Sequence, residues 1–261
     1  MKKILLSFDL EEFDMPLEYG RPISFDQQIH ISATGTNIIL DILRKNQIKA
    51  TFFSTATFAL HATDLIHRII NEGHELASHG YFHSKFEEGH LRESKNELEK
   101  ISGDRIIGFR MPRMMDVNSD AIERAGYLYN SSLNPVYLPG RYNNFFKPRT
   151  VFSVNNVIQL PASATPLIRF PLFWLSFHNL PLWFYKAACV QTINQDKYLN
   201  IYFHPWEFTD LLNPIYGLPG FVSKNSGGKM IDRFCIWIYW MKRRGYGFNT
   251  IKEFIFQSTS K

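Results

Sequence analysis

The chain has 261 residues, 45% of them hydrophobic, which is enough to bury the core of one large α/β domain. Its 29 Lys and Arg exceed its 24 Asp and Glu only modestly and form no basic run, which argues against a nucleic-acid partner. Its two cysteines lie far apart in sequence, so no disulfide framework is expected and both thiols are predicted to be reduced. No linker or internal repeat divides the chain, and a single domain over residues 1–261 is predicted.

The first half of the chain alternates strand-like and helical patterns. Short apolar runs predict strands over 4–8, 50–54, 75–78 and 106–109. Amphipathic or charged patterns predict helices over 35–45, 62–71 and 91–101. Strands that alternate with helices indicate parallel pairing, so we expect an α/β domain with a barrel-like sheet.

The second half continues with a strand over 198–203 and helices over 230–243 and 251–256. The stretch 167–189 breaks this rhythm because it is densely aromatic, but Pro171 and Pro181 interrupt it and exclude a spanning helix. Two interpretations stay open for it. It packs in the core or against another subunit of an oligomer, or it forms an exposed patch that touches a membrane or a lipid-linked substrate.

The amino terminus resembles an export signal only in its first residues. Met1-Lys2-Lys3 is typical of a signal n-region, but the apolar run Ile4–Leu6 ends at Ser7. A signal h-region needs about seven or more apolar residues. The sequence therefore predicts that this segment is the first strand and that the protein is cytoplasmic.

Charged and imidazole side chains follow the predicted strands where each strand ends. They are Asp9, Glu11, His79, His83, Arg110 and His204. The ends of parallel strands open into loops at one edge of a sheet, and α/β barrels place their chemistry there. Two acids, two histidines at i and i+4, an arginine and a further histidine are the components of a mononuclear metal hydrolase.

The expected metal ligands are Glu11, His79 and His83. They would supply one oxygen and two nitrogen donors, which is the three-ligand pattern of a catalytic site with an open position. One turn of backbone separates the two histidines, so both imidazoles can point the same way. One divalent ion is expected, zinc by default, with cobalt, nickel or manganese as alternatives.

The order and spacing of four segments resemble the polysaccharide deacetylase family, also called the NodB-homology or carbohydrate esterase 4 group. The segments are Phe8-Asp9-Leu10-Glu11, Ser78–His83, Gly108–Pro112 and Phe203–Phe208. The first of them is similar to the motif of an Asp-x-Glu branch of this family, and the likeness extends from Ile4 to about Ile255. The resemblance implies a distorted (β/α) barrel of the NodB-homology type.

The resemblance also implies a role for each matched residue. Asp9 corresponds to the general base and Arg110 to the arginine that pairs with it, while Pro112 belongs to the same motif as Arg110. His204 corresponds to the general acid that protonates the departing amine. The backbone N–H of Arg113 corresponds to a donor of the oxyanion hole.

Three positions leave alternatives open. Trp206 is interpreted either as a sugar-stacking surface or as a core residue. The side chain of Arg113 stands where relatives carry an aromatic or small residue, so it narrows the site, binds an anionic group or lies solvated on the surface. Asn130 stands where relatives carry an aspartate, and the missing charge would lower the pKa of a neighbouring His204 and weaken its role as an acid.

The resemblance implies a metal-dependent hydrolase that removes an N-acyl group, by expectation acetyl, from an amino sugar of a polysaccharide or its precursor. The expected partner is a saccharide. The enzyme alternatives are a deformylase or deacetylase of a lipid-linked sugar and an allantoinase-like amidohydrolase. A non-catalytic saccharide-binding relative is the alternative from a different class, and Asn130 and Arg113 are the residues that favour it.

Overall fold

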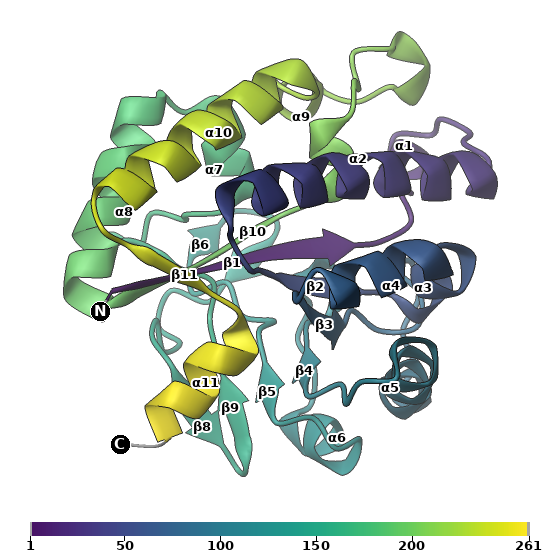
Figure 1. The fold of residues 1–261 in the computed structure, drawn as a ribbon, viewed down its shortest axis with the longest axis horizontal. Helices are drawn as coiled ribbons and strands as arrows, with labels where there is room; N and C mark the ends of the chain where they lie inside the picture. The colour runs from purple at the N-terminus through teal and green to yellow at the C-terminus, as the bar shows by residue number, and fades with distance from the viewer. Residues whose placement is uncertain (1, 260–261) are drawn as a thin grey trace.

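The computed structural model describes residues 2–259, and its centre is a curled sheet (Figure 1). Within these residues the sheet has nine strands in the order β10-β1-β2-β3-β4-β5-β9-β8, and β11 pairs with β1. The strands are β1 (Lys3–Leu10), β2 (Thr51–Ser54), β3 (Glu75–Ser78), β4 (Gly108–Phe109), β5 (Tyr129–Asn130), β8 (Phe152–Val154), β9 (Val157–Gln159), β10 (Tyr198–Phe203) and β11 (Gly247–Asn249). A separate hairpin pairs β6 (Tyr137–Leu138) with β7 (Tyr142–Asn143).

Every pairing in the main sheet is parallel except that of β8 with β9. Within residues 2–259, β8 and β10 are the outer strands of this order and do not pair with each other, so the barrel stays open. The predicted α/β class and distorted barrel are thereby confirmed. Because β1, β2, β3, β4 and β10 run in the same direction, their carboxyl ends meet at one edge and bring together residues far apart in sequence.

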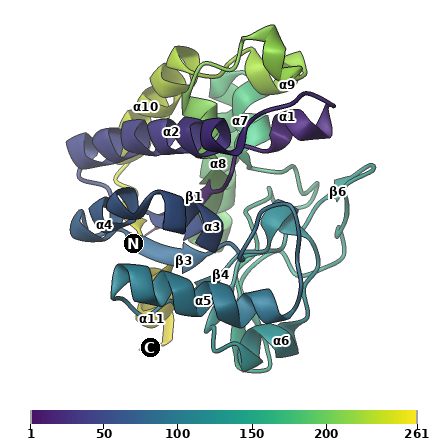
Figure 2. The same cartoon turned by 90° about the vertical axis from the view of Figure 1, so that its right-hand side faces the viewer.

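Helices pack around the sheet. They are α1 (Met15–Glu18), α2 (Phe25–Asn46), α3 (Ala56–His61), α4 (Thr63–Asn71), α5 (Gly89–Ser102), α6 (Ser119–Arg124), α7 (Trp174–Asn179), α8 (Leu182–Asp196), α9 (Gly220–Ser223), α10 (Gly228–Arg243) and α11 (Ile251–Thr259). Short 3-10 turns are η1 (Pro112–Met114), η2 (Pro205–Phe208) and η3 (Pro214–Tyr216). Figures 1 and 2 show α2 and α10 on one outer side of the sheet, with α3, α4 and α5 following beside β2 and β3.

Helix α2 begins ten residues before the predicted helix over 35–45. The side chain of Ser24 accepts the backbone N–H of Gln27, and the Gln27 side chain accepts the N–H of Ser24, so the pair forms a capping box. Further along α2, a Cβ at Gly35 would lie 1.9 Å from the carbonyl oxygen of Pro205. This glycine is therefore required for α2 to pack closely on η2, directly after His204.

The aromatic stretch 167–189 forms two helices, α7 and α8, with Pro181 between them. Some of its side chains are buried, as the core interpretation predicts, and others are exposed, as the surface interpretation predicts. The buried ones include Phe173, Trp174, Phe177 and Tyr185. Trp183 is 71% exposed, and the aliphatic residues Leu167 and Ile168 are also exposed. Across residues 2–259, none of the helices combines the length and the apolar character that crossing a bilayer requires.

Candidate active site

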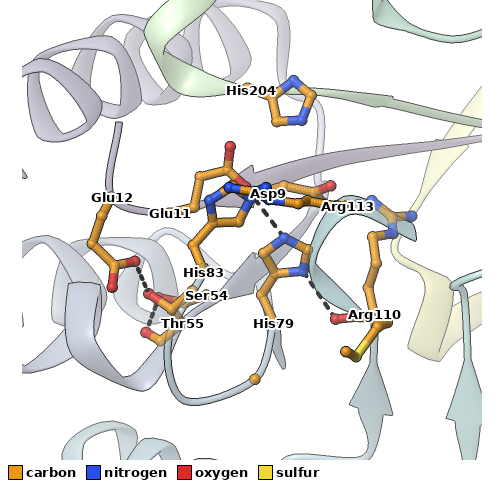
Figure 3. Close-up of polar contacts among 12 residues, drawn as sticks. Asp9, Glu11, Glu12, Ser54, Thr55, His79, His83, Arg110, Arg113 and His204 are labelled. Atoms are coloured by element: carbon orange, nitrogen blue, oxygen red, sulfur yellow. Dashed lines mark hydrogen bonds and ion pairs between the residues drawn. The ribbon is translucent and has the colours of Figure 1, made fainter. Parts of the chain in front are cut away.

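The three predicted metal ligands meet at the carboxyl edge of the sheet. Glu11 follows β1, His79 follows β3, and His83 lies in the loop after it. The Nε2 atoms of His79 and His83 lie 3.3 and 3.1 Å from Oε2 of Glu11. Ligand atoms of the three residues all lie within 4.8 Å of one another, and Figure 3 shows the side chains converging. Two imidazole nitrogens and one carboxylate at this spacing fit a divalent ion.

Each ligand is held by a further group. His79 donates its Nδ1–H to the carbonyl of Arg110 at 2.9 Å, and His83 donates its Nδ1–H to Asp14 at 2.8 Å. Both contacts leave Nε2 free to face Glu11 and fix the tautomer that a metal ligand needs. The indole N–H of Trp206 donates to the other oxygen of Glu11 at 3.1 Å. Asp14 was not singled out from the sequence.

Opposite charges at this site stabilise one another in their ionised forms, although the groups are buried. Burial would lower the pKa of His83, but the Glu11 carboxylate, followed by Asp14, raises it to about 9. Burial would likewise raise the pKa of Glu11, but the His83 and His204 imidazoles hold it well below its ordinary value. Glu11 is therefore ionised and can hold a cation.

Asp9 and Arg110 form a buried ion pair beside the three ligands. Nη1 of Arg110 donates to Oδ1 of Asp9 at 2.6 Å. The guanidinium also donates to the hydroxyl of Ser7 and to both the carbonyl and the hydroxyl of Ser131, and it lies 4.0 Å from the centre of the Phe53 ring. These contacts hold the Arg110 side chain in a single conformation. The Asp9 carboxylate is therefore oriented by a fixed partner.

His204 follows β10 and is oriented by Glu207, three residues later. Oε1 of Glu207 accepts the backbone N–H of His204 at 2.6 Å and the imidazole Nδ1–H at 3.0 Å. On the far side of the same carboxylate, Nε2 of His178 lies 2.9 Å from Oε2. Burial would lower the pKa of His204, but the Glu11 and Glu207 carboxylates raise it. Burial would raise the pKa of Glu207, but His178 and His204 lower it.

The other predicted site residues, Pro112, Arg113 and Trp206, lie in two short 3-10 turns, η1 and η2. Pro112 begins η1, and Arg113 and Met114 within it have left-handed backbones with φ of 57° and 54°. The Arg113 side chain is 36% exposed, and its Nη2 lies 2.9 Å from Glu18 and 3.4 Å from Asp14. Trp206 is 1% exposed, which agrees with the core interpretation of this residue.

Asn130 ends β5 and contacts neighbours on its own side of the sheet. It donates to Oε1 of Gln159 at 2.8 Å and accepts a hydrogen bond from Ser132. The buried carboxylate that contacts His204 is Glu207. The pKa of His204 is raised and not lowered as expected, because the Glu11 and Glu207 carboxylates supply negative charge beside it.

These side chains surround a small cavity of about 50 Å³. Its lining consists of Asp9, Glu11, Asp14, Met15, Glu18, His79, His83, Arg113, Met114, Arg141, Trp174, Tyr202, His204 and Trp206. Half of the lining residues were not predicted as site residues from the sequence: Asp14, Met15, Glu18, Met114, Arg141, Trp174 and Tyr202. Asp14 contacts His83, which lies 69 residues away in sequence, so no local pattern marked it.

Comparison with known proteins finds similarity to polysaccharide deacetylases. A family model described as Polysaccharide deacetylase matches residues 22–128, which include His79, His83 and Arg110. The chitooligosaccharide deacetylase of Bradyrhizobium sp. (strain ANU 289) is 30% identical over 77 residues, 30% of this chain and 34% of that protein. The peptidoglycan-N-acetylglucosamine deacetylase of Bacillus cereus is 36% identical over 73 residues, 27% of this chain and 26% of that protein.

The chain thus matches about a third or less of the length of these curated relatives. The fold likeness is more extensive. The structure of a probable polysaccharide deacetylase from Pseudomonas aeruginosa PAO1 covers 92% of this chain and 85% of its own, with a TM-score of 0.63 and 12% identity. The family model over residues 22–128 and these relatives show that the chain is similar to polysaccharide deacetylases, and the solved structure shows that it shares their fold.

Proposed function

We propose that the protein is a metal-dependent deacetylase that removes an N-acetyl group from an amino sugar of a saccharide. The observation that carries this proposal is the convergence of Glu11, His79 and His83 beside the Asp9–Arg110 pair and His204. The named deacetylases among the relatives support the same reaction class. The proposed site of the acyl group is the cavity lined by Glu11, His79 and His204.

Glu11, His79 and His83 would hold the metal ion. A bound divalent ion supplies a lowered pKa for its water and polarisation of the acyl carbonyl. Trp206 and Asp14 keep the ligands in place, because one donates to Glu11 and the other accepts from His83. Zinc is the default for this donor set, with cobalt, nickel or manganese as alternatives.

The remaining groups divide the proton transfers between them. Asp9, held by Arg110, accepts the proton of the attacking water. His204 gives its Nε2 proton to the departing amine nitrogen, because Glu207 occupies its Nδ1 side. The N–H of Arg113 donates to the developing oxyanion, and the strained left-handed turn at η1 is the backbone feature that supports this assignment.

Two measurements on the purified chain test this function. Metal analysis should find about one divalent ion per chain. Acetate release should be detected from at least one member of a panel of N-acetylated saccharides, including chitooligosaccharides, peptidoglycan fragments and lipid-linked amino sugars. Stoichiometric metal without hydrolysis of any N-acyl substrate would instead support a non-catalytic saccharide-binding protein. Hydrolysis of allantoin alone would support the amidohydrolase alternative.

A further inference from the structure

The solvent-facing surface of α8 and α10 carries large apolar side chains, although polar side chains are expected there. Helix α10 buries Phe234, Trp237 and other residues against the core. Its opposite side carries Ile236 and Tyr239, which are 51% and 62% exposed, and the neighbouring α8 carries Trp183, which is 71% exposed. A helix on the surface of a globular protein ordinarily has charged or polar residues on that side. Side chains of this size at these exposures indicate a contact surface.

Cations alternate with these aromatic rings. We call the α8–α10 face the surface made by Trp183, Lys186, Tyr239, Trp240, Arg243 and Arg244. Lys186 and Arg244 lie over the Trp240 ring, 5.3 and 4.2 Å from its centre, and Arg243 lies 5.8 Å from the centre of the Tyr239 ring. Trp183, Lys186, Trp240 and Arg244 also line one groove of about 600 Å³, so the two helices contribute to a continuous surface.

The positive charge of the α8–α10 face is not neutralised. Helices α8 and α10 contain two acids. Asp196 is paired with Arg149, and Asp232 is exposed one turn before Ile236 and makes no ion pair with Lys186, Arg243 or Arg244. Within residues 2–259, Lys186, Arg243 and Arg244 make no ion pair with a carboxylate. Three cations among exposed aromatic rings fit a partner that is anionic and has an apolar layer directly beneath its charges.

We propose that the α8–α10 face binds the surface of an anionic lipid bilayer. Tryptophan and tyrosine prefer the boundary between headgroups and acyl chains, while lysine and arginine extend their charged ends to lipid phosphates. An anionic saccharide would use the cations but leave Ile236 exposed to water. A second copy of the chain, related by a two-fold axis, would place cations against cations. This inference does not depend on the proposed hydrolysis.

Flotation of the purified protein with lipid vesicles tests this proposal. The protein should bind mixed phosphatidylglycerol and phosphatidylcholine vesicles and should bind pure phosphatidylcholine vesicles far more weakly. The triple change Lys186→Gln, Arg243→Gln and Arg244→Gln should lower the partition coefficient on the order of 100-fold, since each cation near an anionic leaflet contributes about fivefold. The double change Trp183→Ser and Tyr239→Ser should lower it roughly tenfold or more.

Matched controls distinguish binding through the α8–α10 face from nonspecific electrostatic or hydrophobic binding. Lys85→Gln, Lys100→Gln and Lys252→Gln together remove the same charge elsewhere, and Tyr137→Ser with Phe146→Ser removes two aromatics that are 61% and 95% exposed. These variants should keep vesicle binding. Absence of binding by the unmodified protein, or equal losses in the controls, overturns the proposal. Two other results also overturn it, provided that none of the proteins binds vesicles. One is a dimer in sedimentation that the α8–α10 face variants abolish. The other is retention on an anionic polysaccharide that the same variants abolish.

Discussion

Glu207 holds the imidazole of His204 from a position only three residues away. One oxygen of this buried carboxylate accepts both the backbone N–H and the Nδ1–H of His204, at 2.6 and 3.0 Å. The ring is thereby fixed with Nε2 away from Glu207, and one short turn, η2, contains both the proposed acid and the group that orients it. His178 lies 2.9 Å from the other oxygen and helps to hold the carboxylate.

Glu207→Gln should lower kcat for amide substrates by about 10²–10⁴, because a side-chain amide can donate to Nδ1 and favour the wrong tautomer of His204. The measurement compares the loss of kcat on an amide substrate with the loss on an ester substrate. An activated aryl acetate has a leaving group that needs no proton, so its hydrolysis should fall much less. His178→Gln is the milder companion variant, with a smaller loss in the same direction. Equal losses on amide and ester would show that Glu207 does not act through the acid.

Asp9→Asn should keep the metal and lower turnover by roughly 10²–10⁴, the usual contribution of a positioned general base. Arg110→Ala should impair the same step, and the double variant should lose less than the product of the two single losses, because the pair acts as a unit. Thermal unfolding of each variant is needed beside the kinetics, since Arg110 is fully buried. Near-normal turnover in Asp9→Asn would exclude it as the base.

His79→Ala should remove most of the bound metal at neutral pH, because it deletes one of three protein ligands. Metal content after dialysis is the measurement. The variants His67→Ala and His30→Ala change exposed histidines outside the cavity lining and serve as controls. If stoichiometric metal survives the double change His79→Ala and His83→Ala, the metal binds elsewhere.

Asp14→Asn should weaken metal binding by about 10–100-fold without deleting a ligand, which is the usual effect of removing the carboxylate that holds a metal-bound histidine. A competition titration with a chelator of known affinity gives the dissociation constant. Glu18→Gln is the matched control, because Glu18 also pairs with Arg113 but does not contact His83. An unchanged constant in Asp14→Asn would show that the His83 contact does not tune the site.

The sequence sufficed for the parts of this protein whose signal is local. The apolar runs that become β1, β3 and β10 are continuous, and a charged residue follows each strand, so both the strands and the edge they share could be predicted. Helix α2 was predicted too short because its start depends on a capping box that has no hydrophobic periodicity. The strand predicted over 106–109 is paired only at β4, its last two residues.

The supporting groups of the site could not be predicted in the same way. Asp14 and His178 act through contacts made across the fold, and neither belongs to a periodic pattern. The exposure of Trp183 beside buried Trp174 is likewise set by how α7 and α8 turn at Pro181. Composition marks the stretch as aromatic, but tertiary packing decides which rings face water.

The last prediction concerns the acid stability of the fold. His74 is 6% exposed, and its Nδ1 accepts the N–H of Ala50 at 3.2 Å, which requires the neutral ring. Burial, followed by the nearby positive charge of Lys49, lowers the pKa of His74 from 6.5 to about 4. Between these values the unfolded chain binds a proton that the native protein does not, so the free energy of unfolding falls as the pH falls. The contribution is fully present above the unfolded pKa, and up to about 3 kcal/mol is lost by the time the pH reaches the folded value.

His74→Gln keeps a hydrogen-bond acceptor for Ala50 but cannot titrate, so its unfolding free energy should decline less than that of the unmodified protein over the same pH range. Urea unfolding at several pH values between about 7 and 4 measures both curves. Carboxylates titrate in both proteins, and the difference between the curves isolates His74. A difference that does not change with pH would show that folding does not shift the pKa of His74.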